Sequence, residues 1–416
     1  MSRILYQLAI NGYSFLLKGL APFHPKARLM VVGRQDLFNQ IETALAGNQH
    51  PVAWFHCASL GEFEQGRPLI EKFAALYPEY RIVLTFFSPS GYEVRKNYGG
   101  AHHIFYLPMD CPSHARQFLN LVNPQLAVFV KYEFWYNYLT ELHRRGIPAI
   151  SVSAIFRPGQ LFFKPYGSFY RNLLKNFTHI FTQNETSARL LQEAGIEQVS
   201  VAGDTRFDRV LQTAAAVKTI PVVEAFKGAG AVFVIGSSWP QDMTVLLPFI
   251  QKWATRLKFI IAPHEIHEQE IQELKASLGG LALRYSEALA ETVADYPVLL
   301  IDNIGMLSSL YAYGSFAYVG GAFGKGLHNT LEAAAFGLPL FFGPVYHKFQ
   351  EAQDLVAQGL AFPIQTTAEL EEKFTAVHNS QAQQDFIRQQ ATRYVQSQSG
   401  ATDKILQRIN EWLPKI

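Results

Sequence analysis

From residue 52 onward, short runs of apolar, β-prone residues alternate with stretches of helical pattern. A first series of such runs begins with VAWFHCA at 52–58 and ends with QVSVA at 198–202, and a second begins with AVFVIG at 231–236 and ends with LPLFF at 338–342. Near-continuous apolar strands separated by helices are typical of a parallel sheet covered on both faces. The pattern therefore predicts an α/β protein of two doubly wound, Rossmann-like domains that face each other across a cleft, with ligands at the carboxyl ends of the strands.

The gap between the two series sets the expected domain boundaries. Residues 211–230 are rich in alanine, end in glycine and carry no strand pattern. We predict an N-terminal domain over residues 36–210, a linker over 211–230 and a C-terminal domain over 231–416, whose last helix is a candidate to pack back on the first domain. A chain of 416 residues with 49% hydrophobic residues can bury two separate cores.

Residues 1–35 differ in composition from the rest of the chain. They carry five Lys or Arg residues and no Asp or Glu, and polar residues interrupt the apolar stretch between Arg3 and Lys18. This stretch is shorter and more polar than the roughly 20 apolar residues that span a bilayer, and it lacks the cleavage site of a secretory signal. We interpret the segment as a basic amphipathic helix on an anionic membrane surface. An ordinary helix packed on the first domain is the alternative.

Charge and cysteine content exclude several classes of protein. A net charge of +2 gives no sign of nucleic-acid binding. Cys57 and Cys111 have no CxxC spacing, and we interpret them as reduced residues of a cytoplasmic protein. The chain has no zinc pattern, and the absence of an Asp-x-Asp motif argues against a nucleotide held through a divalent ion. We therefore expect neither a metal nor a cofactor.

Residues 315–343 have the pattern of a ligand-binding corner, in which a strand, a glycine-rich turn, a helix and a second strand follow one another. The glycines between 320 and 326 let the backbone approach a bound group closely. A helix that begins at Asn329 points unpaired N–H groups at this turn, which favours a phosphate. Asn329 and Glu332 also have the spacing of a capping box, which would use such N–H groups for stability alone. Neither a P-loop nor a GxGxxG motif is present, which argues against an ATPase or a dehydrogenase.

In the first domain, charged residues follow the predicted strands. Glu62 opens a helix after the first strand, where it is either a surface helix-start residue or a base that takes a proton from a substrate hydroxyl. Lys131 and Glu133 follow a later strand, and period-two spacing puts both on one side of an extended segment. An ion pair between them is the alternative. Arg206 places a cation beside an anionic ligand or pairs with a neighbouring aspartate.

In the second domain, the motif GSSWPQD at 236–242 offers backbone N–H groups and hydroxyls after the first strand, a position suited to a phosphate or a sugar acid. His264 follows the second strand. His264 and His267 are too few to indicate a metal, and a core or capping histidine is the alternative to a ligand-binding one.

Taken together, these blocks resemble the Kdo transferase family, bacterial enzymes that move 3-deoxy-D-manno-oct-2-ulosonic acid (Kdo) from CMP-Kdo to a lipid A precursor. The resemblance covers nearly the full chain, beginning with its short basic, apolar N-terminus. It implies a two-domain GT-B fold and a peripheral, monotopic protein at the cytoplasmic face of the bacterial inner membrane. The blocks that carry it are WFHCASLGE, LPMD, NPQLAVFVKYEFWYN, TQNE, GDTRFD, GSS, DNIGMLSSLYAYGSFAYVGGAF and HNTLEAAAFGLPLFFGP.

The resemblance also implies roles for individual residues. Glu62 matches the general base of an inverting, metal-independent displacement at the anomeric carbon of Kdo, and Arg206 stands where the family has a lysine that stabilises the transition state. The resemblance also makes Lys131 and Glu133 candidate catalytic residues of the first domain. CMP would bind the second domain, with Glu332 accepting from ribose hydroxyls. The positions that match the nucleotide site are Pro263, His264, Ile304, Gly305, Met306, Asn329, Thr330, Leu331 and Glu332.

Three positions depart from the family pattern, which usually has arginine at the place of His264 and glutamate at the places of Met306 and Lys131. The resemblance makes CMP-Kdo, a lipid A precursor and the membrane surface the expected partners, with no nucleic acid. Two alternatives remain: another GT-B glycosyltransferase that uses a UDP-sugar, and a non-catalytic protein that binds a sugar nucleotide or lipid at the membrane surface.

Overall fold

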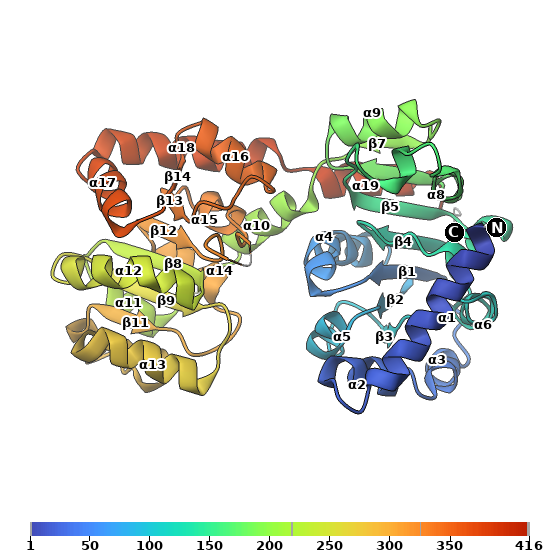
Figure 1. Cartoon of the computed structure of the whole chain (residues 1–416), viewed down its shortest axis with the longest axis horizontal. Coiled ribbons are helices and arrows are strands. Elements are labelled where there is room, and N and C mark those ends of the chain that lie inside the picture. Colours follow the sequence, from blue (N-terminus) through green and yellow to red (C-terminus); the bar gives the residue numbers. More distant parts are fainter. Residues whose placement is uncertain (1, 218, 325, 414–416) are drawn as a thin grey trace. The chain divides into compact units, whose positions relative to one another are not determined.

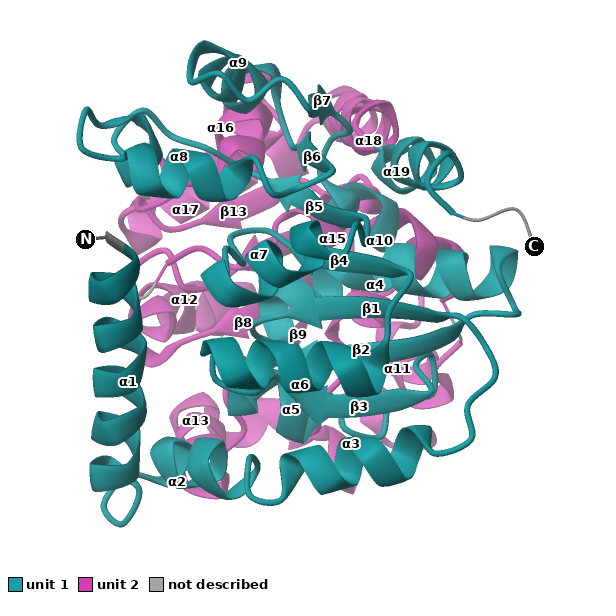
Figure 2. Ribbon diagram, turned by 90° about the vertical axis from the view of Figure 1, so that its right-hand side faces the viewer, with its two compact units in different colours: residues 1–209, 399–416 teal, residues 210–398 magenta. Residues whose placement is uncertain are grey.

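The computed structural model describes residues 2–217, 219–324 and 326–413, and the chain forms two compact units (Figure 1). Unit 1 comprises residues 1–209 and 399–416, and unit 2 comprises residues 210–398 (Figure 2). Within the described residues each unit contains one seven-stranded sheet whose neighbouring strands all pair in parallel. The predicted fold class, two doubly wound α/β domains, is confirmed in this respect.

The sheet of unit 1 has the strand order β3-β2-β1-β4-β5-β6-β7. Its strands are β1 (Val52–Cys57), β2 (Arg81–Phe86), β3 (His103–Tyr106), β4 (Leu126–Val130), β5 (Ala149–Ala154), β6 (His179–Thr182) and β7 (Val199–Val201). The helices that begin in this unit are α1 (Ser2–Leu20), α2 (Pro25–Val32), α3 (Leu37–Leu45), α4 (Leu60–Leu76), α5 (Pro89–Arg95), α6 (Pro112–Val122), α7 (Tyr136–Arg144), α8 (Ser168–Leu174), α9 (Glu185–Glu193), α10 (Thr205–Ala215) and α19 (Ala401–Ile409).

Successive residues of the central strands of unit 1 enter two different apolar cores. Trp54 and Phe129 belong to the core on one face of the sheet, and Phe55 and Val128 belong to the core on the other. Because side chains alternate across a strand, two covered faces require apolar residues at every position. This is why these strands have continuous apolar runs in the sequence.

The sheet of unit 2 has the order β10-β11-β9-β8-β12-β13-β14. Its strands are β8 (Val232–Ser238), β9 (Lys258–Pro263), β10 (Ala282–Arg284), β11 (Val298–Leu300), β12 (Phe316–Val319), β13 (Leu340–Phe342) and β14 (Ala361–Pro363). The helices are α11 (Pro221–Lys227), α12 (Pro240–Trp253), α13 (Glu268–Leu278), α14 (Leu307–Leu310), α15 (Leu331–Ala335), α16 (Gln350–Ala357), α17 (Thr367–His378) and α18 (Gln381–Ser397). The edge strand β14 was not predicted, because it ends in a proline and is only partly buried, so it lacks the apolar β-prone run of the other strands.

Helix α1 packs along the rest of unit 1 (Figure 2). One of its faces is turned inward, and the other exposes apolar side chains. The inner face includes Leu17, which is buried against Ala27 and Met30 of α2. The packed-helix alternative is thus confirmed for this face. Among the described residues, no helix combines the length and the apolar character that a membrane span needs. The exposed apolar side chains of this outer face are Ile4, Leu5, Leu8, Phe15, Leu16 and Leu20, whereas Tyr13, 39% exposed, stacks on Phe87 of unit 1.

The unit boundaries differ from the predicted domains at two places. Residues 211–230, predicted as a linker, contain the end of α10 and the whole of α11, and α11 buries Val223 and Phe226 in unit 2. Residues 399–416, predicted in the C-terminal domain, belong to unit 1. There α19 places Ile405 and Ile409 in the core of the sheet, so the last helix packs on the first unit.

Asp208 ties the chain at residue 400 to unit 1. Its carboxylate accepts hydrogen bonds from the Gly400 N–H (2.6 Å), the Thr402 N–H (2.7 Å) and the Thr402 hydroxyl (2.6 Å). Thr402 is buried, so an N–H group left without its acceptor there is costly. The return of α19 therefore depends on a single side chain as well as on apolar contacts.

We expect Asp208→Ala to destabilise unit 1 by about 1–3 kcal/mol, because it removes three hydrogen bonds to a carboxylate. Thermal unfolding would measure the loss, and limited proteolysis should cut more readily near residue 400. Asp403→Ala removes only a partly exposed pair with Lys72 and serves as the control, with an expected loss below about 1 kcal/mol. Equal effects of the two substitutions would contradict the role assigned to Asp208.

Candidate active site

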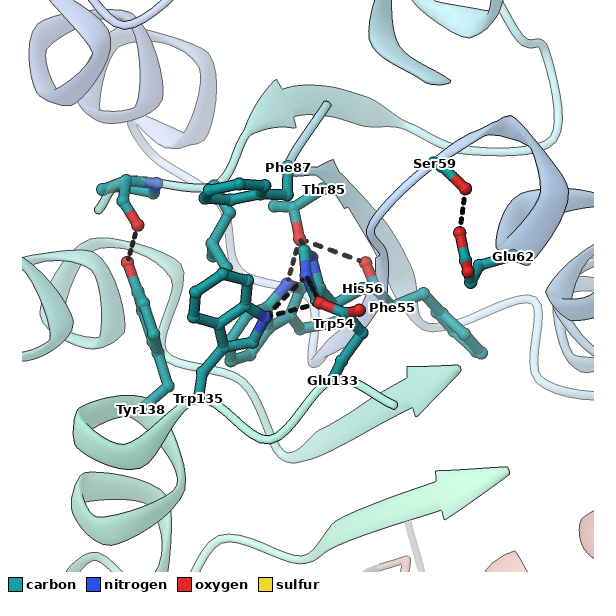
Figure 3. Close-up of polar contacts among 12 residues, drawn as sticks. Trp54, Phe55, His56, Ser59, Glu62, Thr85, Phe87, Glu133, Trp135 and Tyr138 are labelled. Carbon is teal, nitrogen blue, oxygen red and sulfur yellow. Dashed lines mark hydrogen bonds and ion pairs between the residues drawn. The ribbon is translucent and has the colours of Figure 1, made fainter. Parts of the chain in front are cut away.

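The carboxyl ends of β1 and β4 lie next to each other because these strands pair in parallel. His56, near the end of β1, is fully buried, and Glu133 follows β4. The Nε2 atom of His56 lies 3.2 Å from Oε2 of Glu133. The Trp135 indole N–H points at both atoms, 2.7 Å from Glu133 Oε2 and 3.1 Å from His56 Nε2 (Figure 3). With Thr85, these residues form what we call the His56 cluster.

Hydrogen bonds orient the His56 ring from its other side. The Trp54 indole donates to the Thr85 hydroxyl oxygen (2.8 Å), and the Thr85 hydroxyl donates to the Phe55 carbonyl (3.4 Å). His56 Nδ1 therefore acts as a donor to the same hydroxyl oxygen, at 2.9 Å. The His56 ring is thus fixed from both sides, by Thr85 at Nδ1 and by Glu133 and Trp135 at Nε2.

Glu62 lies in the first turn of α4, directly after β1, as the sequence predicted. The Ser59 hydroxyl at the helix N-cap donates to its carboxylate (Figure 3). Burial raises the pKa of the Cys57 thiol well above its usual value, and the carboxylates of Glu62 and Glu133 both add to this rise. The two carboxylates are thus close enough to act on one thiol at the end of β1.

The charge of Glu62 also affects the hydroxyl of Tyr132. Burial raises the pKa of its hydroxyl, Arg157 opposes the rise, and Glu62 adds to it. Arg157 follows β5, the strand next to β4. The carboxyl edge of the sheet therefore brings carboxylates, a phenol and a guanidinium near one another.

Lys131 does not continue the strand, contrary to the extended segment that the spacing argument assumed. Its φ of 66° lies in the left-handed region, which turns the chain away from β4. Glu133 hydrogen-bonds with His56 and Trp135 instead of lying in strand register with Lys131. Ser153 near the end of β5 and Ser237 near the end of β8 also have positive φ. Such backbone strain is common at ligand-binding edges.

Arg206, in the first turn of α10, pairs with Asp204. Its Nε lies 2.8 Å from Asp204 Oδ2, and its backbone N–H donates to Oδ1 at 2.9 Å. The pairing alternative from the sequence is confirmed for Asp204, whereas Asp208 binds the C-terminal segment. A buried partner such as Asp204 holds the guanidinium in one place, which suits a cation that must meet an anionic ligand.

The corner after β12 is capped by its own side chains. Helix α15 begins at Leu331, two residues later than predicted, and the Leu331 N–H donates to Asn329 Oδ1 (3.2 Å). The Asn329 amide in turn donates to Glu332 Oε1 (3.1 Å). The predicted capping box itself is not formed, because the N-cap residue is Thr330 and its side chain makes no capping hydrogen bond; the Asn329 side chain nevertheless occupies one N–H group of the helix start. A phosphate on the Leu331 N–H would have to replace the Asn329 side chain.

The glycine turn at this corner is held by Asp242, which the sequence analysis did not single out within the motif 236–242. Its buried carboxylate accepts from the N–H groups of Gly321 (2.9 Å) and Trp239 (2.8 Å) and from the Tyr318 hydroxyl (2.8 Å). Gly321 has a φ of 96°, which favours glycine. The sequence contained a signal for this role, because Asp242 lies in the first turn of a helix that begins with Pro240.

Three aromatic rings stack at the carboxyl end of β9. The His264 ring lies 4.1 Å from the His328 ring and 4.7 Å from the Trp239 ring, centroid to centroid. The Trp239 indole donates to His328 Nε2 (2.9 Å), which leaves Nδ1 as the protonated nitrogen of His328. Burial lowers the pKa of His328 to about 4, and the neighbouring His264 adds to this effect.

The remaining predicted nucleotide positions follow strands at the same edge. The strands β11, β9, β8 and β12 are consecutive in the sheet, so the segments that follow them lie along one edge. Ile304 is 89% exposed, Gly305 has a φ of 95° and Met306 caps α14. Thr330 and Leu331 are buried, and the Thr330 hydroxyl has no hydrogen-bond partner within the described chain. Residues 2–217, 219–324 and 326–413 contain no group of three or more His, Cys, Asp or Glu placed to hold a metal ion.

Comparison with known proteins identifies the class as glycosyltransferases. Residues 34–209 match the family model described as 3-deoxy-D-manno-octulosonic-acid transferase (kdotransferase). The 3-deoxy-D-manno-octulosonic acid transferase of Chlamydophila psittaci is 30% identical over 330 residues, 74% of this chain and 73% of that protein. The transferase of the same name from Aquifex aeolicus is 29% identical over 329 residues, 77% of this chain and 84% of that protein. The chain belongs to the Kdo transferase family.

Solved structures support the fold. A putative UDP-N-acetylglucosamine 2-epimerase from Listeria monocytogenes has a TM-score of 0.61 at 12% identity, over 86% of this chain and 96% of that one. The calicheamicin glycosyltransferase CalG4 has a TM-score of 0.56 at 14% identity, over 89% of this chain and 100% of that one. At such low identity the likeness concerns the fold alone, and it agrees with the predicted GT-B class.

We expect the His328→Gln variant to lose less stability than the native protein when the pH is lowered. The unfolded chain takes up a proton on His328 near pH 6.5, whereas the folded protein does so only near pH 4. The neutral ring therefore contributes fully to the free energy of unfolding above pH 6.5, and this contribution is lost as the pH falls toward 4. Thermal midpoints measured between pH 7.5 and 4.5 should fall less in the variant than in the native protein.

His267→Gln changes an exposed histidine of the same unit and serves as the control. His179 of unit 1, whose pKa is also lowered to about 4 by burial, is present in all three proteins and cancels in the comparison. A pH trend that is the same in both variants would contradict the assignment to His328.

Proposed function

We propose that the protein transfers Kdo from CMP-Kdo to a lipid A precursor of the lipid IVA type, with inversion and without a metal. Membership of the Kdo transferase family supports the transferred sugar. The observation that carries the proposal is the position of Glu62. It opens α4 at the carboxyl end of β1, inside the segment that matches the family model and beside the His56 cluster.

In this proposal, Glu62 is the general base. Its carboxylate takes the proton of an acceptor hydroxyl, whose oxygen forms a bond to the anomeric carbon of Kdo. The bond from that carbon to the phosphate oxygen breaks, and CMP leaves with the electron pair. The Ser59 hydroxyl orients the carboxylate, and the start of α4 stabilises its charge before the proton arrives.

Three more charged residues of unit 1 have roles in this proposal. Arg206, fixed by Asp204, supplies the positive charge that stabilises the departing phosphate. Glu133 is held by His56 and Trp135 and accepts hydrogen bonds from sugar hydroxyls. Lys131 adds a second cation at the carboxyl end of β4.

Unit 2 holds the nucleotide in this proposal. The ribose hydroxyls donate to Glu332, and the phosphate takes the place of Asn329 on the Leu331 N–H. The segments at 263–264 and 304–306 lie along the same edge of the sheet and contact the rest of CMP.

The acceptor is a lipid, and we propose that α1 and α2 rest on the cytoplasmic face of the bacterial inner membrane. The exposed apolar side chains of α1 continue with Phe23 and Val32 around α2. Arg3, Lys18 and Lys26 are exposed among them, and residues 1–35 contain no acidic residue. Apolar and basic groups together suit an anionic lipid surface.

We expect Glu62→Gln to lower transfer from CMP-Kdo to lipid IVA by about 10²–10⁴-fold, the usual loss for a general base. Binding of CMP should be unchanged, because the substitution lies in unit 1. Glu64→Gln removes a carboxylate from the next turn of α4, where it pairs with Arg95 at 2.6 Å, and should leave transfer close to native. Transfer by Glu62→Gln at the native rate would remove Glu62 from the mechanism.

We expect the double substitution Leu8→Ser and Phe15→Ser to lower binding to anionic phospholipid vesicles by about tenfold or more, because less apolar area enters the lipid. Phe15 is 81% exposed, so the thermal midpoint should stay near native. Leu76→Ser, an exposed leucine at the end of α4, is the matched control and should bind vesicles normally. Equal vesicle binding by all three proteins would contradict the proposed surface.

A further inference from the structure

The inner face of α1 carries a tyrosine that is bonded into the middle of unit 1. The Tyr6 hydroxyl donates to Asp110 Oδ2 at 2.5 Å and accepts from the Tyr136 N–H at 3.3 Å. The Tyr6 ring packs on Tyr136, at 5.6 Å between centroids, and on Phe169, at 6.1 Å. Burial raises the pKa of Tyr6, and the Asp110 charge adds to the rise. These contacts are more than the anchoring of a surface helix requires.

Asp110 is shared between Tyr6 and the start of α7. Its carboxylate, 1% exposed, also accepts from the N–H groups of Asn137 and Tyr138, each at 3.1 Å. These are N–H groups of the first turn of α7, which lack partners within the helix. Trp135 is the N-cap residue of this helix. The hydrogen bonds of Tyr6 therefore hold the backbone on which the Trp135 side chain stands.

A second path reaches the Trp135 ring itself. Tyr13, two turns farther along α1, stacks on Phe87 with centroids 6.2 Å apart, and Phe87 packs on Trp135 at 4.7 Å. Arg34 lies 5.0 Å above the Phe87 ring and donates to the Phe87 carbonyl at 2.7 Å. The indole is thus confined by the inner face of α1 on one side. Its N–H faces the His56 cluster on the other side (Figure 3).

We infer that Tyr6 and Tyr13 are positioning residues of the transferase: through Tyr136, Phe87 and Trp135 they orient the carboxylate of Glu133. The inference rests on the proposed function, because it takes Glu133 as an acceptor-side residue. The outer face of the same helix bears the apolar residues proposed to lie on the membrane. One helix then contacts the lipid surface with one face and sets the geometry of the sugar site with the other.

The test substitutes Tyr6→Phe, which keeps the ring and removes the hydroxyl. Asp110 keeps its bonds to the start of α7, so the fold should survive. We expect kcat/KM for a detergent-solubilised lipid A precursor to fall about tenfold, since a small displacement of a positioned group is costly in catalysis. The KM for CMP-Kdo and the binding to anionic vesicles should stay native.

Tyr80→Phe is the matched control. It removes the hydroxyl of a buried tyrosine of unit 1 that is bonded to Gln125 at 3.3 Å; both residues directly precede their strands, β2 and β4, and so lie at the edge of the sheet opposite Trp135. It should lose comparable stability and keep native kcat/KM. Equal activity of Tyr6→Phe and Tyr80→Phe would overturn the inference, as would a tenfold loss in both.

Tyr13→Leu and Trp135→Phe give two further readings. Tyr13 is 39% exposed, so its substitution does not endanger folding, and a several-fold loss of kcat/KM is expected from the missing stack. In the double variant Tyr6→Phe/Trp135→Phe, the losses should be less than multiplicative, because both act through one indole N–H. Fully multiplicative losses would overturn the inference. Absence of Kdo transfer by the native protein would instead refute the proposed function.

Discussion

Parallel pairing of the strands is the constraint on which the rest of each unit depends. A parallel sheet places the carboxyl ends of all its strands at one edge, so segments that are far apart in the chain lie near one another there. Glu62 after β1 and Glu133 after β4 meet in unit 1 for this reason. In unit 2 the segments after β11, β9 and β12 lie along one edge in the same way.

Each unit uses a buried carboxylate to hold the loops at this edge. Asp110 in unit 1 joins α1 to the start of α7, and Asp242 in unit 2 joins the start of α12 to the glycine turn after β12. A buried carboxylate is costly unless several donors surround it. Once they do, the loops that supply the donors can hardly move independently, which gives the residues on them fixed positions.

Most of the candidate site could be predicted as positions along the chain, but not as contacts. Glu62 lies at the helix start where the sequence placed it, and Arg206, for which the sequence indicated only a cation, also lies in a first helical turn. The partner of Glu133 could not be predicted, because His56 is 77 residues away and comes close only when β1 and β4 pair. The left-handed conformation of Lys131 could not be predicted either, since nothing in its neighbours indicates it.

The amino-acid sequence by itself determined the alternation of strands and helices and the two-unit α/β class, because burial on both faces of a sheet requires continuous apolar runs. It also contained the blocks that show the family. The tertiary structure alone decided that α19 returns to unit 1 through Asp208 and that Tyr6 of α1 meets Asp110. These are hydrogen bonds between particular groups, which a local pattern cannot specify because each depends on where a distant segment packs.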